Sequence, residues 1–184
     1  MKVKLNKEKL DKLSPEDAIP LLIRLRKLVL GSKRPDVFTR VVFSLNLFSW
    51  ILFFSWNSIS YVVLIMSNVI KENKGFSVNA IIRRKGRDLG FEGQDFLETI
   101  TSFFLLQHFV WVIIFVGIIL MYRKLRLYVL IYLGGFSIHF FMMFWMLGLQ
   151  YFIEDISSFD KVLYGVMLLS VFLHSLLLNK ENKA

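Results

Sequence analysis

The chain of 184 residues contains no cysteine. Disulfide bonds, cysteine-ligated zinc, iron–sulfur clusters and thiol catalysis are therefore excluded. The sequence also lacks the HExxH and GxSxG motifs and any glycine-rich loop in a strand-to-helix context that would bind phosphate. These absences leave no recognisable catalytic or metal-binding motif, so the sequence predicts a protein that is not an enzyme and that holds no metal.

Charge is scarce inside four long apolar runs, at residues 41–70, 98–121, 127–152 and 161–178. Hydrophobic residues form 55% of the chain, whereas the 20% that are charged lie between these runs. A helix needs about 20 apolar residues to cross a bilayer. The sequence predicts an all-α membrane protein in which residues 41–178 form a bundle of four transmembrane helices. It also predicts an amphipathic interfacial helix before this bundle.

The first run, residues 41–70, carries a polar stripe. At about 100° per residue, six of its polar side chains fall within an arc of roughly 100°. They are Asn46, Ser49, Asn57, Ser60, Ser67 and Asn68. An unpaired amide or hydroxyl in lipid costs free energy, so this stripe should face protein, as a helix-packing surface, or line a water-filled pore.

Residues 1–40 are predicted to form a cytoplasmic basic arm and the amphipathic surface helix. Residues 14–17, Ser-Pro-Glu-Asp, are typical of a helix start. The following apolar residues share one side, and they are Ile19, Leu22, Leu25 or Ile23, Leu28 and Val29. This pattern predicts a helix on the membrane surface. Packing on the soluble face of a partner is the alternative.

The distribution of Lys and Arg predicts the orientation. If the N-terminus is cytoplasmic, 16 of the 23 Lys and Arg lie on the inner side, in residues 1–40, 122–126 and the tail 179–184. The outer side has the polar loop 71–97, which would fold as an interfacial helix or dock on another molecule. The positive-inside rule then places both termini in the cytoplasm and the protein in the cytoplasmic (inner) membrane as a multi-pass protein. Because the charges cluster at span ends and no nucleic-acid-binding motif occurs, we expect no nucleic-acid partner.

All three histidines lie within the predicted spans. Ionisable groups inside a membrane are functional candidates, and His108 and His139 lie at depths that tilt could align. His174 lies nearer the inner face and would not join them. This pair could ligate a b-type haem or serve a proton relay. The alternative is that each histidine is neutral and bonded across helices, in which case no cofactor is needed.

The third run predicts a helix-packing seam. Tyr132, Gly135 and Gln150 are taken from a series of residues at alternating three- and four-residue steps along one side, which also includes Tyr128, His139, Met142 and Met146. Gly134 and Gly135 would allow a close helix approach. Packing is the commoner meaning of such a seam, and a cofactor slot is the alternative.

These features favour a non-catalytic integral membrane subunit of a larger envelope complex, such as a scaffolding, anchoring or accessory subunit of a transport or secretion assembly. Its partners would be the lipid bilayer and either other membrane protein subunits or further copies of itself. Two alternatives stay open: a haem electron-transfer subunit using His108 and His139, and a homo-oligomeric channel or membrane-permeabilising protein. Ion-coupled carriers are disfavoured because no carboxylate lies at depth in a span.

Overall fold

The computed structural model describes residues 15–31 and 35–181, which contain helices and no strand. Four of the helices are long and apolar enough to cross a membrane. The chain is therefore an all-helical, multi-pass membrane protein, as the sequence predicts. Residues 1–14 and 182–184, in the predicted basic arm and tail, lie outside the described residues. The helices are α2 (Pro15–Leu30), α3 (Val37–Ile65), α4 (Ser67–Lys74), α5 (Val78–Asp88), α6 (Gly93–Tyr122), α7 (Leu127–Glu154) and α8 (Ser158–Glu181).

The first apolar run is divided between α3 and α4. The Asp36 carboxylate accepts a hydrogen bond from the backbone N–H of Thr39 (3.0 Å) and caps the helix, so α3 begins at Val37 rather than at residue 41. Met66, at φ −84° and ψ 8°, ends α3 before residue 70. The 29 residues of α3 span about 44 Å, which exceeds the hydrocarbon core of about 30 Å.

Helices α6 and α7 approach one another closely through two glycines. A Cβ atom on Gly117 would lie 2.9 Å from the Cβ of Tyr132 and 3.0 Å from its backbone. A Cβ atom on Gly135 would lie 2.8 Å from Cγ1 of Ile114. Small residues permit such close approach, which is a main source of helix association in a bilayer. The predicted close approach involves Gly135, whereas Gly134 has no atom within 4 Å of its Cβ position.

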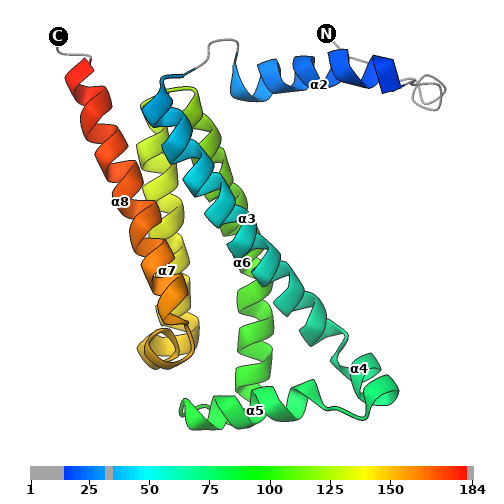
Figure 1. Ribbon diagram of the computed structural model, residues 1–184. Coiled ribbons are helices and arrows are strands. Elements are labelled where there is room, and N and C mark those ends of the chain that lie inside the picture. Colours follow the sequence, from blue (N-terminus) through cyan, green and yellow to red (C-terminus); the bar gives the residue numbers. More distant parts are fainter. Residues whose placement is uncertain (1–14, 32–34, 182–184) are drawn as a thin grey trace.

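Helix α7 breaks near its end. Gly148 has φ 82° and ψ 164°, a backbone conformation that glycine adopts readily and other residues rarely do. The uninterrupted part, residues 127–147, is about 32 Å long, which matches the hydrocarbon thickness. Figure 1 shows the last turn of α7 viewed end-on below the long part of the helix. The third apolar run therefore crosses the membrane and then turns before α8 begins.

Much of the loop 71–97 is helical. Figure 1 shows α5 lying across the end at which α6 begins. A Cβ atom on Gly86 would collide with the Cβ of Phe96, so α5 rests directly on α6. Lys85 forms an ion pair with Asp155 (2.6 Å) at the end of α7, and this pair raises the pKa of Lys85. The opposite end of the molecule carries α2, which extends crosswise to α3 (Figure 1).

The close α6–α7 contact makes a testable prediction. Gly117→Ala should lower the free energy of unfolding by about 1–3 kcal/mol, because the new methyl group meets the backbone of Tyr132. Titration with a denaturing detergent, followed by circular dichroism, measures this change. Gly134→Ala is the matched control, because its methyl group enters open space. Equal stability of the two variants would contradict the close approach.

Candidate functional site: buried polar clusters and a cavity between the spans

Asn46 lies at the centre of the first polar cluster. It is 0% exposed, and its Nδ2 donates to the Val42 carbonyl and to Oγ of Ser170, each at 2.8 Å. Its Oδ1 accepts a hydrogen bond from the Tyr132 hydroxyl. One amide therefore links α3 to α7 and α8. Its nitrogen donates two hydrogen bonds, and its oxygen accepts one.

Most of the remaining residues of the predicted polar stripe also face protein. Ser49, Asn57 and Ser67 are buried with Asn46, and Ser60 is half-buried. Ser49 donates to the carbonyl of Leu45 (2.9 Å) in its own helix. Ser67 and Asn68 lie in α4, and Asn68 is exposed, so the prediction that it faces protein is wrong.

His108 faces α3 from α6. Its Nδ1 lies 2.7 Å from the Phe104 carbonyl and 2.9 Å from Nδ2 of Asn57. Its Nε2 lies 3.1 Å from Oγ of Ser58. The imidazole therefore joins α6 to the polar stripe of α3, and both of its ring nitrogens lie within hydrogen-bond distance of protein groups.

His139 lies between α6, α7 and α8, and is 3% exposed. Its Nδ1 lies 2.7 Å from Oε1 of Gln107, and its Nε2 lies 3.2 Å from the Tyr164 hydroxyl. Because a carboxamide oxygen can only accept, Nδ1 donates to it; the neutral ring then accepts from Tyr164 through Nε2. Three spans are linked by one neutral histidine.

The two candidate haem ligands therefore face different neighbours: His108 bonds to α3, and His139 bonds to α6 and α8. Ligation of an iron would require each ring to give up one of these hydrogen bonds. The haem assignment and the proton relay stay predictions. Within residues 15–31 and 35–181, no group of three or more His, Cys, Asp or Glu side chains could hold a metal ion.

A further cluster, which the sequence reasoning did not find, surrounds His174. Nε2 of this ring lies 2.9 Å from Oγ1 of Thr39, and Nδ1 lies 2.7 Å from the Tyr128 hydroxyl. Thr39 also donates to Asp36 (2.7 Å), which forms an ion pair with Lys124 (2.7 Å). The cluster thus extends from the ion pair at the start of α3 to a buried histidine of α8. The helix-capping spacing of Asp36 and Thr39 was its only signal in the sequence.

The charge of the Asp36 carboxyl follows from its ion pair and hydrogen bonds. Partial burial raises the pKa of the Asp36 carboxyl, but hydrogen bonds from Lys124 and Thr39 outweigh burial and hold this pKa well below its ordinary value of 3.8. The carboxylate is therefore charged at neutral pH. It anchors the first turn of α3 to the turn between α6 and α7.

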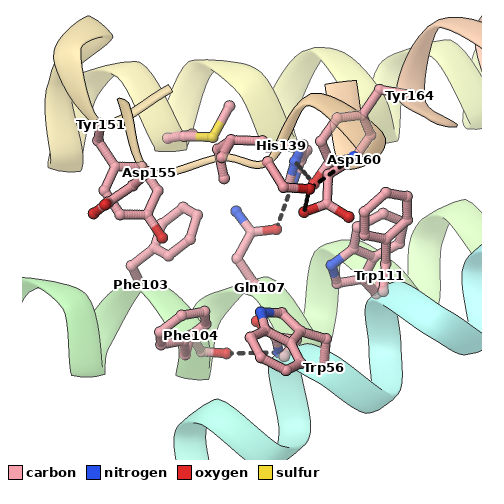
Figure 2. A pocket seen from close by; sticks show the side chains of 15 residues that line it. Trp56, Phe103, Phe104, Gln107, Trp111, His139, Tyr151, Asp155, Asp160 and Tyr164 are labelled. Carbon is pink, nitrogen blue, oxygen red and sulfur yellow. Dashed lines mark hydrogen bonds between the residues drawn. The ribbon is translucent and has the colours of Figure 1, made fainter. Parts of the chain in front are cut away.

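A cavity of about 200 Å³ lies beside the His139 cluster, between α3, α6, α7 and α8. Figure 2 shows aromatic side chains around it, with Gln107 extending into its middle and the Gln107 oxygen bonded to His139. Asp155 and Asp160 also line the cavity. Nε2 of Gln107 is buried and has no hydrogen-bond partner in the part of the chain that the structure describes.

Two of the three predicted seam residues lie against α6. Tyr132 is buried beside Gly117, and Gly135 lies beside Ile114. Gln150 follows the break at Gly148, is exposed, and donates to Glu154 (2.9 Å). The change of chain direction at Gly148 therefore separates Gln150 from the other two.

No known protein family, curated protein or solved structure matches this chain. The geometry alone therefore guides the functional interpretation. Within the spans, the polar clusters consist mainly of amide, hydroxyl and imidazole groups that bond to one another across helices. Hydrogen bonds of this kind hold helices in a fixed position relative to one another. The described residues leave the Nε2 donor of Gln107 without a partner.

The Asn46 cluster makes a second prediction. Asn46→Leu should lower the free energy of unfolding by about 1–3 kcal/mol, because it leaves the Tyr132 hydroxyl and Ser170 without their partner in a buried site. Detergent-induced unfolding of the purified chain measures this loss. Asn68→Leu is the control, because Asn68 is exposed. The double variant Asn46→Leu/Tyr132→Phe should recover part of the loss, and no recovery would argue against the hydrogen bond.

A third prediction concerns pH. Asp36→Asn keeps an oxygen that can cap α3 but removes the charge pairing with Lys124, so at pH 7 it should cost roughly 0.2–1 kcal/mol of stability. Because the folded pKa lies below 3.8, the stabilisation is complete above that pH and is lost as the pH falls toward the folded pKa. The difference between the wild type and the variant, measured by unfolding at a series of pH values, should therefore shrink below pH 3.8. A difference that is constant with pH would contradict the charge assignment.

Proposed function

We propose that this chain is a non-catalytic integral membrane subunit of a larger envelope complex, with a scaffolding or anchoring role. The observation that carries the proposal is that polar side chains within the spans bond to one another. Asn46, His139 and His174 each connect different helices. The polar groups therefore serve to hold the four spans together, and the buried stripe favours helix packing over the lining of a pore.

The proposal includes an orientation with both termini in the cytoplasm. Exposed basic residues lie at the end of the molecule where α3 begins and where α6 and α7 meet; they include Arg40, Arg123 and Arg126. Helix α2 lies crosswise at the same end (Figure 1) and exposes both Arg24 and Leu28. Basic residues favour the cytoplasmic side, and a helix with exposed apolar and basic side chains suits a membrane surface.

Helix α5, at the opposite end, supplies the proposed partner-binding surface. Arg83, Arg84 and Arg87 are exposed, and none of them forms an ion pair with a residue that the structure describes. Lys85, by contrast, pairs with Asp155. Three adjacent guanidinium groups on a helix that is itself fixed to α6 would suit an acidic surface of another membrane subunit.

The fourth prediction tests this proposal. When the chain is extracted from its native membrane in a mild detergent, light scattering and mass spectrometry should find it in a complex much larger than its own 21.7 kDa. Replacement of Arg83, Arg84 and Arg87 by Gln should weaken this association about tenfold at low salt, because each exposed charge contributes modestly.

The matched control replaces Lys71 and Lys74, exposed on the neighbouring helix α4, by Gln and should leave the complex intact. A monodisperse single chain with an activity of its own would contradict the proposed function. An intact complex in the triple arginine variant would contradict only the assignment of α5 as its contact surface.

A further inference from the structure

The cavity beside Gln107 contains a hydrogen-bond donor that the protein does not use. Gln107 is 1% exposed, yet its Nε2 has no partner among the described residues. Leaving a buried donor unbonded is unfavourable, and native proteins leave few such groups. An acceptor that enters the cavity would recover this cost.

The other end of the same amide is firmly held. Tyr164 donates to His139, and His139 donates to Oε1 of Gln107. Figure 2 shows this chain of bonds along one side of the cavity. Successive hydrogen bonds polarise one another in a low-dielectric interior, so the N–H groups of Gln107 are strengthened as donors. The amide cannot turn to satisfy its nitrogen without losing the bond from His139.

The walls of the cavity favour a flat, apolar ring. Phe53 stacks on Tyr164 at a centroid distance of 4.4 Å and an interplanar angle of 4°, and on Trp111 at 5.2 Å and 14°. All three side chains line the cavity. Aromatic surfaces of this kind pack well against another ring.

The volume of the cavity, its exposed side and its acidic residues indicate which class of ligand could bind. About 200 Å³ is smaller than the 300–1,000 Å³ of a site for a drug-sized molecule, so the cavity would hold a ring system rather than a whole lipid. Trp56, which is 67% exposed on α3, also lines it, so a ligand's tail could leave toward the bilayer. The carboxylates of Asp155 and Asp160 disfavour an anion.

We propose that this cavity binds the ring of a neutral, lipid-soluble carbonyl compound of the quinone class. Its carbonyl oxygen accepts a hydrogen bond from Nε2 of Gln107, and its ring lies among Phe53, Trp111 and Tyr164. The proposal concerns binding only and includes no electron transfer. It goes beyond the scaffolding role and does not depend on it, because it concerns the interior of a single chain.

The test compares two probes of similar shape. Menadione is a fused-ring quinone, and methylnaphthalene has the same ring system without the carbonyl groups. Binding of each to the full chain in lipid nanodiscs is measured by equilibrium dialysis against empty nanodiscs, which corrects for partition into lipid. After subtraction of the uptake by empty nanodiscs, menadione should bind saturably and about tenfold more tightly than methylnaphthalene. The difference is expected because only menadione can accept a hydrogen bond from the otherwise unbonded donor of Gln107.

The variant Gln107→Leu keeps much of the side-chain volume and removes the amide. It should weaken menadione binding about tenfold and leave methylnaphthalene binding unchanged. Gln94→Leu is the matched control, because Gln94 lies on the same helix, is exposed and bonds to Glu98. This control should bind both probes like the wild type.

Three results would overturn the proposal: no excess of menadione over empty nanodiscs, equal affinity for the two probes, or unchanged menadione binding in a folded Gln107→Leu variant. Circular dichroism reports whether the variant folds. If it does not, the comparison of the two probes on the wild type decides the proposal alone. These outcomes are independent of the mass of the native complex, so they are distinguishable from a failure of the proposed function.

Discussion

The interior of a bilayer offers no water to bond an amide, a hydroxyl or an imidazole, and this constraint shapes how the four spans meet. The effect is clearest on α8. Three residues of α8 bond to other helices. Tyr164 bonds to His139, and Ser170 accepts a hydrogen bond from Asn46. His174 lies within hydrogen-bond distance of Thr39 and Tyr128. These three residues of α8 thus belong to different clusters along its length. These bonds fix both the translation of α8 along its axis and its rotation about that axis. Apolar contacts alone do not specify either one.

The remaining spans are held by complementary means. Gly117 and Gly135 let α6 and α7 pack closely, and this contact provides the frame on which the polar clusters are built. Ion pairs close both ends: Asp36 with Lys124 where α3 begins, and Lys85 with Asp155 where α7 ends. Within this well-bonded interior, the free nitrogen of Gln107 is an exception. A binding site explains it because the donor already lies in a cavity of suitable size.

The four spans could be predicted because apolar runs of sufficient length have one main structural outcome. The burial of Asn46, Ser49 and Asn57 follows from helical periodicity, which is local to one helix. Other features depend on information that periodicity does not contain. The break at Gly148 depends on a backbone conformation, and the cluster of His174 depends on which spans are neighbours. For the same reason, the sequence drew attention to His108 and His139 as a pair, although they bond to different helices.

The central claim is that the polar face of α3 is covered by the other spans of the same chain. Because the protein has no cysteine, single cysteines can be introduced along α3 and spin-labelled without interference. In lipid nanodiscs, labels at positions 49 and 57 should be shielded from both oxygen and a water-soluble nickel reagent, whereas labels at exposed positions 48, 52 and 59 should meet oxygen from the lipid. Access of nickel to position 49 or 57 would indicate a water-filled lumen, and access of oxygen would indicate lipid; either result would contradict the account.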